Sequence, residues 1–326
     1  MLNFEKLKKW LHFDNDNLRM FDTGFRGIYS IKNIKKGEII ISVPSKYIIQ
    51  YSDIENKKLP KVINTNSLVA AFLYLKSNKL KSFFKPYLHS FPKKLDEYIY
   101  FYDKSKLNLL KNTSIMCHNT YNFNVHIENI KSDCKIIHNY LLHKKLLLEE
   151  HIDYASFFPI FLKFRILVCS RIFGYMKNGK EENGMVPYAD LLNHSQNPNT
   201  TWYFNDNNNC FEVIATKNIK HNTEIFDSYG DKENVNLIMY YGFSIKNNKF
   251  SQLNFMLKDN LINANYDSTL DSLMHQNDNK SYTKLELIEK LKSILESHKK
   301  SVKKTDDYNI LNIYNDEVTI INKLLK

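Results

Sequence analysis

The spacing of apolar side chains changes from segment to segment along the chain. Residues 4–13 carry an apolar side chain every three or four positions, which is typical of a short amphipathic helix. Residues 27–34 alternate apolar and polar side chains, whereas residues 39–44 form a β-branched run. A glycine-containing turn at residues 35–38 separates the two runs, so the pattern predicts a hairpin of two short strands.

The next clear pattern is helical. Residues 66–80 place apolar side chains along one face. Asn66 or Ser67 is the expected N-cap, because either side chain can accept a hydrogen bond from the first turn. We therefore predict a helix over residues 66–80.

A predominantly helical stretch follows, from about residue 107 to residue 173. Within it, residues 141–152 and 157–173 are apolar-periodic segments long enough for helices. Pro159 lies near the start of the second segment, where a helix tolerates a missing amide.

Strand character returns at residues 210–219, after an asparagine-rich loop at 205–209 whose residues suit a turn with positive φ. Beyond about residue 246 the chain is expected to lose strand character, with helices at 285–300 and 317–326. The whole pattern indicates an α+β fold, in which a helical insertion splits a strand-rich unit and a helical tail follows.

Composition narrows the functional classes. With 326 residues and 43% apolar side chains, the chain can bury a large core as one large domain or two modest ones. The net charge of +11 would suit nucleic acid, but nearly all of it comes from scattered lysines. Arginine forks are the usual readers of phosphates and bases, so this composition disfavours specific nucleic-acid binding. The arginines are Arg19, Arg26, Arg165 and Arg171.

The four cysteines show neither a CxxC pair nor paired histidine spacing, which disfavours a structural zinc site. Reduced thiols in a chain of this size favour a cytoplasmic or nuclear compartment. The N-terminus is patterned as an amphipathic helix rather than a signal peptide, and no run approaches 18 apolar residues. A soluble protein with no membrane partner is therefore expected.

Two short stretches carry the candidate chemistry. Residues 185–195, MVPYADLLNHS, couple a carboxylate at Asp190 to an Asn-His pair. Residues 227–243, DSYGDKENVNLIMYYGF, set a Tyr-Gly turn ahead of an aromatic doublet.

The order of four segments resembles SET-domain methyltransferases. The segments are FRGIYSIKNIKKGEIIISVP, SRIF, VPYADLLNHS and SYG followed by YYGF. The subgroup is similar to the one that includes the Rubisco large-subunit lysine methyltransferase and the actin-histidine methyltransferase. This resemblance implies a SET domain of short β-sheets with a pseudo-knot, split by a helical insertion and followed by a helical C-terminal domain. It also implies S-adenosyl-L-methionine as the cofactor.

The resemblance divides the chain into five parts. They are an N-terminal helix (1–18), the first part of the SET domain (19–106), a helical insertion (107–168), the second part of the SET domain with the cofactor and catalytic motifs (169–245), and a helical substrate-binding region (246–326).

The resemblance also assigns cofactor-binding residues. Asn193 and His194 would hold the adenine and the amino-acid portion of the cofactor, largely through main-chain groups. Asp190 would brace that turn, with a helix or turn cap as its structural alternative. Arg171 matches the position whose guanidinium meets the cofactor carboxylate, a charge-assisted pair. Gly27 would bring the backbone close to the cofactor.

Tyr229 matches the family tyrosine whose hydroxyl sits by the methyl group and steers the incoming amine, so it is the expected catalytic residue. Tyr241 is assigned to the cofactor, and Phe173, Tyr188 and Phe243 to the substrate channel, where aromatic faces favour a cation. Core packing is the alternative for each aromatic residue. No metal ion is expected.

Two positions depart from the family pattern. The first glycine motif has an extra residue between Gly24 and Gly27, and Gly27 is retained as the contact with the cofactor. Lys76 stands where relatives often carry a glutamate beside the cofactor. Because that contact is partly main-chain, cofactor binding need not be lost with the glutamate.

The acceptor is predicted from two positions. Phe173 stands where the lysine enzymes carry phenylalanine and the histidine enzyme carries asparagine, and Ala189 replaces a tryptophan of the histidine enzyme. An apolar slot desolvates an ammonium and favours the neutral amine that attacks. The chain is therefore expected to be a protein-lysine N-methyltransferase. The resemblance implies a non-histone protein as the target, and a monomer is expected. A histidine methyltransferase and a catalytically silent SET scaffold are the alternatives.

Overall fold

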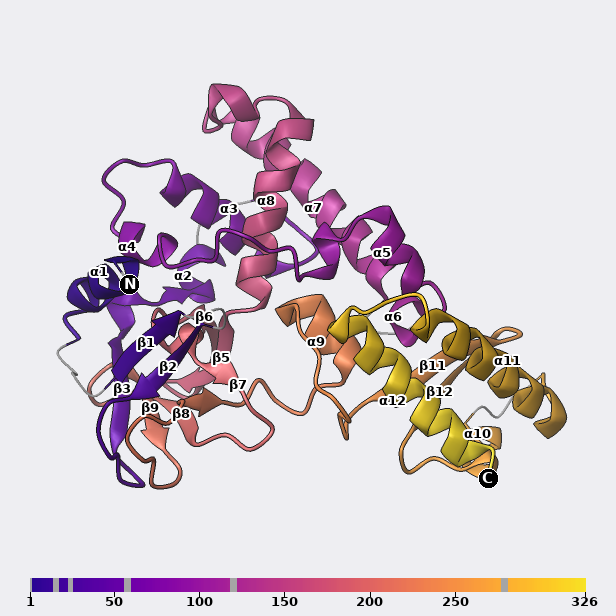
Figure 1. Ribbon diagram of the computed structural model, residues 1–326. Helices are drawn as coiled ribbons and strands as arrows, with labels where there is room; N and C mark the ends of the chain where they lie inside the picture. The colour runs from indigo at the N-terminus through magenta and orange to yellow at the C-terminus, as the bar shows by residue number, and fades with distance from the viewer. Residues whose placement is uncertain (1, 14–17, 23–25, 56–59, 118–121, 277–280) are drawn as a thin grey trace. The chain divides into compact units, whose positions relative to one another are not determined.

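The computed structural model describes residues 2–13, 18–22, 26–55, 60–117, 122–276 and 281–326. The chain forms two compact units and passes between them three times (Figure 1). Unit 1 comprises Met1–Lys93 and Ile130–Gly230, and unit 2 comprises Lys94–Asn129 and Asp231–Lys326. Among the described residues, no helix combines the length and the apolar character that crossing a membrane requires.

Two three-stranded antiparallel sheets form the framework of unit 1. Their strand orders are β3-β9-β8 and β4-β6-β5. The first contains β3 (Ile39–Pro44), β9 (Cys210–Ala215) and β8 (Thr200–Asn205), and the second contains β4 (Ile49–Gln50), β6 (Lys180–Met185) and β5 (Ile172–Lys177). Ile41 and Val43 of β3 pair with Val213 and Phe211 of β9, and all four side chains are buried. This apolar ladder belongs to the core of unit 1.

Two smaller pairs complete the strands of unit 1. β1 (Leu18–Asp22) pairs antiparallel with β2 (Arg26–Ser30), and β7 (Asn193–His194) pairs parallel with β10 (Phe226–Asp227). The predicted hairpin of residues 27–34 with 39–44 is therefore wrong, because β2 joins β1 whereas β3 joins β9. The turn between β2 and β3 is held by distant residues instead, with Ile34 bridging Ile219.

Helices α1 (Leu2–Leu11), α2 (Tyr51–Glu55), α3 (Thr65–Ser77), α4 (Lys85–Leu88) and α8 (Tyr154–Cys169) belong to unit 1. The predicted N-terminal helix and the helix over 66–80 are confirmed. The N-cap of α3 is Asn64 rather than Asn66 or Ser67, and its side chain accepts from the amide of Asn66. α3 packs against α8.

The helical stretch of 107–173 is more broken than its periodicity predicts. α7 (Phe123–His143), whose residues are divided between the two units, ends inside the segment 141–152. Lys145 adopts a positive φ of 54°, and a short 3₁₀ turn (Glu149–His151) precedes Asp153, the N-cap of α8. A single helix over 141–152 is therefore wrong, and α8 ends at Cys169, so the SRIF segment leads into β5.

Unit 2 is mostly helical. It holds α5 (Lys104–Leu109), α6 (Ser114–Cys117), α9 (Asn234–Tyr241), α10 (Leu270–Met274), α11 (Lys284–Val302) and α12 (Tyr308–Leu324). It also holds an antiparallel hairpin of β11 (Gln252–Leu257) and β12 (Asn260–Asn265), so the expected loss of strand character beyond residue 246 is wrong. α11 and α12, the two long yellow helices of Figure 1, share a core with this hairpin.

Candidate active site

The parallel pair of β7 and β10 brings the two sequence motifs together. The main-chain amide of Tyr229 donates to His194 Nδ1 over 3.0 Å, and the ring centroids of the two residues lie 5.1 Å apart. The hydroxyl of Tyr229 donates to the carbonyl oxygen of Leu192 over 2.7 Å. The predicted catalytic tyrosine is therefore hydrogen-bonded through both its main-chain amide and its hydroxyl. Both acceptors belong to the motif that contains the predicted cofactor-binding histidine.

Asn193 connects β2 to the segment that precedes β10. Its side-chain amide donates to the carbonyl oxygen of Arg26 and to Glu224 Oε1, both over 2.7 Å. Glu224 Oε2 accepts from the hydroxyl of Tyr29 over 3.1 Å. The side-chain amide of Asn193 is therefore engaged within the protein, and its main chain pairs with Phe226 of β10. Its role in binding the cofactor stays a prediction.

Gly27 lies directly against the Glu224 carboxylate. A Cβ atom on Gly27 would lie 2.4 Å from Glu224 Oε1 and 2.9 Å from Glu224 Cδ. No side chain fits there without a shift of the carboxylate, so close packing explains this glycine. The other glycine of the motif, Gly24, lies outside the described residues.

Arg171 and Asp190 form a buried ion pair. Arg171 Nη1 donates to Asp190 Oδ2 over 3.0 Å and to the Asp190 carbonyl oxygen over 3.1 Å. A third residue, Tyr87 of α4, donates its hydroxyl to the same Asp190 Oδ2 over 2.6 Å. Asp190 therefore does not act as a helix cap but links two segments far apart in sequence. Its other oxygen, Oδ1, is buried and finds no hydrogen-bond partner among the residues that the structure describes.

Phe173 is buried in an aromatic cluster at the start of β5. Its ring makes edge contacts with Trp202 and Phe211 at centroid distances of 5.5 and 5.1 Å. Ala189 is fully buried in the 3₁₀ turn that carries Asp190. The surroundings of Phe173 are thus apolar, which the prediction of a lysine acceptor requires.

Tyr188 packs against the N-terminal segment. Its ring centroid lies 5.1 Å from that of Phe4 and 4.8 Å from that of Phe13. The residue adopts a positive φ of 76°, which is rare for an aromatic side chain and indicates local strain. Its assignment to the substrate channel stays a prediction.

Three further positions were singled out from the sequence, two in unit 2 and one in unit 1. Tyr241 and Phe243 flank Gly242 at the C-terminal end of α9, with ring centroids 6.3 Å apart, and belong to unit 2. Their roles stay predictions. Lys76 lies in the last turn of α3, with its ammonium 4.9 Å from the centroid of the Phe72 ring.

Asp227 of β10 is a buried carboxyl that pairs with His194 of β7. Burial raises its pKa to about 6, although hydrogen bonds from Ser228 and Trp202 act in the opposite direction. Its carbonyl oxygen accepts from the amide of Ser195. The motif region thus contains a group that titrates slightly below neutral pH.

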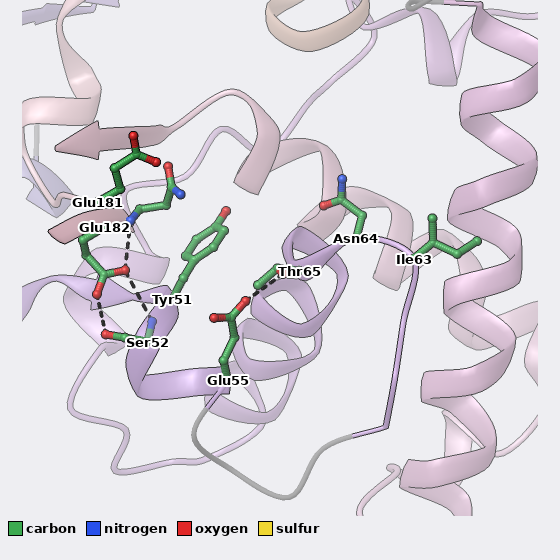
Figure 2. A pocket seen from close by; sticks show the side chains of 9 residues that line it. Tyr51, Ser52, Glu55, Ile63, Asn64, Thr65, Glu181 and Glu182 are labelled. Carbon is green, nitrogen blue, oxygen red and sulfur yellow. Dashed lines mark hydrogen bonds between the residues drawn. The ribbon is translucent and has the colours of Figure 1, made fainter. Parts of the chain in front are cut away.

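A surface hollow of about 400 Å³ lies elsewhere on unit 1 and contains none of the predicted site residues (Figure 2). It carries the carboxylates of Glu55, Glu181 and Glu182. Figure 2 shows that Glu182 is bonded to Ser52 and Glu55 to Thr65, so two of the three carboxylates serve local structure. The two sequence motifs therefore do not line this hollow.

Sequence reasoning missed Tyr87, Glu224 and Asp227. Asp227 begins the second motif, so its position in the sequence could have drawn attention to it. Tyr87 and Glu224 lie outside the four quoted segments, and their contacts join positions 103 and 31 residues apart. No local pattern indicates such pairings.

Known proteins share this sequence pattern and architecture. A family model described as the SET domain matches residues 25–230. SET domain-containing protein 4 of Artemia parthenogenetica is 21% identical over 281 residues, which cover 83% of this chain and 68% of that protein. Actin-histidine N-methyltransferase of Otolemur garnettii is 22% identical over 274 residues, which cover 78% of this chain and 44% of that protein.

The solved structure of the SET domain of LSMT bound to lysine and AdoHcy superimposes with a TM-score of 0.74 at 17% identity. The match covers 99% of this chain and 90% of that chain. At this identity the likeness shows the fold. The expected α+β architecture of small sheets with helical segments is therefore confirmed.

Proposed function

The chain belongs to the SET-domain family, and from that premise we propose that it is an S-adenosylmethionine-dependent protein-lysine N-methyltransferase acting on a non-histone protein. The observation that carries the proposal is the closed arrangement of Tyr229 and His194, in which both family motifs meet through direct hydrogen bonds. A scaffold without activity has no need to keep the tyrosine hydroxyl oriented.

The residues present fit the cofactor. Asp190 Oδ1 is a buried carboxylate oxygen that lacks a donor among the described residues, and such atoms are costly unless a ligand supplies one. Arg171 would hold the carboxylate of the cofactor, and the main-chain groups of Asn193 and His194 would hold its adenine and amino-acid portion. When bound, S-adenosylmethionine supplies an electrophilic methyl group on a sulfonium.

The residues of this chain then have two tasks. The hydroxyl of Tyr229, oriented by its bond to Leu192, would steer the attacking amine into line. The aromatic surroundings of Phe173 would exclude water and favour the neutral amine over the ammonium. Both tasks concern alignment and desolvation rather than acid catalysis.

Lysine is favoured as the acceptor by Phe173, whose ring lies against Trp202 and Phe211, and by the small side chain of Ala189. The LSMT structure, described as bound to lysine, is in keeping with this choice. Histidine is the second candidate, because relatives named actin-histidine N-methyltransferase match 78% of this chain. We further propose a cytoplasmic or nuclear monomer whose residues 246–326 present the target protein.

The test is transfer of radiolabelled methyl from S-adenosylmethionine into a lysate of the source cells, followed by acid hydrolysis and amino-acid separation. Tyr229→Phe is run beside the wild type, with Tyr203→Phe, an exposed tyrosine on β8, as the control. Label in methyl-lysine that is lost only in Tyr229→Phe supports the proposal. Label in methylhistidine alone would overturn the lysine assignment. A chain that neither binds the cofactor nor transfers label would be a silent scaffold.

The many lysines of the chain make self-methylation a required control. Reactions without lysate measure it directly, and only label above that background counts as substrate methylation.

A further inference from the structure

Three buried groups from separate segments converge at Asp190. Tyr87 is fully buried, Arg171 is 8% exposed, and the side chain of Asp190 is fully buried. Tyr87 and Arg171 both donate to the same oxygen, Asp190 Oδ2, over 2.6 and 3.0 Å. Two donors from different directions fix that oxygen more firmly than either would alone.

Tyr87 is a permanent donor in this arrangement. Burial raises the pKa of its hydroxyl, and the nearby charge of Asp190 raises it further. The hydroxyl therefore keeps its proton at physiological pH, and Asp190 Oδ2 is its acceptor. The short distance is the one expected for a hydroxyl bonded to a carboxylate.

The turn that carries Tyr87 also contacts Arg171 through Phe91. The Phe91 ring lies 4.8 Å from the Tyr87 ring and 5.4 Å from the guanidinium carbon of Arg171. The guanidinium is thus in contact with both a carboxylate and an aromatic ring. Both supports are fixed to residues 87–91.

The same turn is tied to the strand that carries Gly27. Ser90 donates its hydroxyl to the Tyr87 carbonyl oxygen over 2.7 Å. The Ser90 carbonyl oxygen in turn accepts from Arg26 Nη1 over 2.7 Å. The turn therefore connects the two predicted cofactor contacts, Gly27 and Arg171, that lie far apart in the sequence.

We propose that Tyr87 is a positioning residue for cofactor binding, which holds Asp190 and thereby fixes Arg171 in the orientation that takes the cofactor's carboxylate. The inference rests on the proposed function. If the hydroxyl of Tyr87 is removed, Asp190 Oδ2 keeps only Arg171 as its donor, so the carboxylate is free to turn toward the guanidinium. The arginine is then drawn away from a ligand carboxylate, whereas contacts with the adenosine part are unaffected.

The test compares two ligands that differ in the amino-acid portion. S-adenosylhomocysteine carries the carboxylate, and 5′-methylthioadenosine has the same nucleoside and thioether without it. Dissociation constants for both are measured by calorimetry on the full chain, as wild type, Tyr87→Phe and Tyr175→Phe. Tyr175 is the matched control, because it is a buried tyrosine of unit 1 whose hydroxyl has no hydrogen-bond partner among the described residues.

We expect Tyr87→Phe to weaken the binding of S-adenosylhomocysteine by about tenfold, because the displaced Arg171 makes a poorer charge-assisted bond to the ligand carboxylate, and to leave the binding of methylthioadenosine within about twofold. Tyr175→Phe should leave both ligands within about twofold of wild type. The inference is overturned if Tyr87→Phe binds both ligands as tightly as the wild type does. It is also overturned if the affinities for both ligands fall by the same factor, because an equal loss indicates a general structural role.

Failure of the proposed function gives a different result. A folded wild-type chain that binds neither ligand removes the cofactor assignment and the inference with it. In another outcome, the wild type binds S-adenosylhomocysteine, Tyr87→Phe weakens that binding selectively as expected, and yet no methyl group is transferred. This outcome upholds the positioning role and overturns only the enzyme assignment.

Discussion

The main-chain amide of Tyr229 donates a 3.0 Å hydrogen bond to Nδ1 of His194. An imidazole nitrogen that accepts a hydrogen bond carries no proton, so the neutral ring must hold its proton on Nε2. The bond lies next to the parallel pair of β7 and β10. It fixes the residue expected to steer the amine relative to the residue expected to bind the cofactor.

We therefore expect His194→Ala and His194→Asn to differ. Alanine leaves the amide of Tyr229 without this acceptor, which should cost about 1–2 kcal/mol in the free energy of unfolding and at least tenfold in methyl transfer. The side-chain oxygen of asparagine can reach a place near that of Nδ1, so His194→Asn should retain more of both. Urea unfolding and single-turnover rates measure the two effects. His221→Ala, at an exposed histidine, is the control. Equal losses in the two His194 variants would contradict the hydrogen-bond explanation.

Gly27→Ala should disturb Glu224 directly. The new Cβ would lie 2.4 Å from Glu224 Oε1, so the carboxylate must move away from Asn193. We expect a loss of about 1–3 kcal/mol in the free energy of unfolding. Because Glu224→Ala removes the obstructing atoms, Gly27→Ala should cost little when added to that variant.

A double-mutant cycle monitored by urea unfolding measures this coupling between Gly27 and Glu224. Gly174→Ala is the milder comparison, since its Cβ would meet only the end of the Asn183 side chain at 3.2 Å. If the losses in the free energy of unfolding from Gly27→Ala and Glu224→Ala are strictly additive, a clash with Glu224 is not the reason that residue 27 is a glycine.

How much of this site can be predicted from the sequence depends on how far apart in the sequence the contacting residues lie. His194 and Tyr229 lie in two motifs whose order is characteristic of the family, so their association follows from the resemblance. The contact of Tyr87 with Asp190 joins residues 103 positions apart and has no counterpart in any local pattern. Hydrogen bonds of this kind depend on how the elements pack.

In the fold, too, local elements can be predicted from the sequence and long-range pairings cannot. Single helices such as α1 and α3 follow from apolar periodicity, whereas the pairing of β3 with β9 does not, because the choice of partner depends on which apolar faces are buried together. The hairpin of β11 and β12 is a different case. Leu253, Phe255 and Leu257 alternate along the sequence and are all buried, so this strand has a signal in the local sequence pattern.

Glu317 is expected to be critical for the stability of unit 2. Its carboxylate is almost fully buried and accepts from the amide of Ser114 over 2.8 Å and bonds His298 Nε2 over 2.5 Å. Glu317→Leu leaves both buried partners without an acceptor, which should cost about 3–5 kcal/mol in the free energy of unfolding. Glu317→Gln keeps one acceptor oxygen and should cost less.

The matched control for Glu317 is Glu296→Leu, which removes an exposed pair with Lys299 on α11. Such pairs contribute about 0.5 kcal/mol or less. Urea unfolding compares the three variants. A loss in Glu317→Leu no larger than that in Glu296→Leu would rule out a structural role for the buried carboxylate.

Asp227 should make the stability of the protein fall as pH rises from about 4 to about 7. Burial raises its folded-state pKa to about 6, above the value of 3.8 that applies when it is exposed. Between these values the folded protein binds more protons than the unfolded chain, so raising the pH favours unfolding. The difference amounts to about 2–3 kcal/mol once the pH exceeds both values.

Asp227→Asn removes the titration while keeping a side-chain oxygen for the Trp202 hydrogen bond. Relative to wild type, its free energy of unfolding should therefore rise by about 2–3 kcal/mol between pH 4 and pH 8, because only the wild type must bury a charge at the higher pH. Urea unfolding across this range measures the difference, with Asp53→Asn, at an exposed aspartate, as the control. Parallel pH profiles for wild type and Asp227→Asn would mean that the Asp227 carboxyl ionises in the folded protein as readily as in the unfolded chain, and that β10 is open to water.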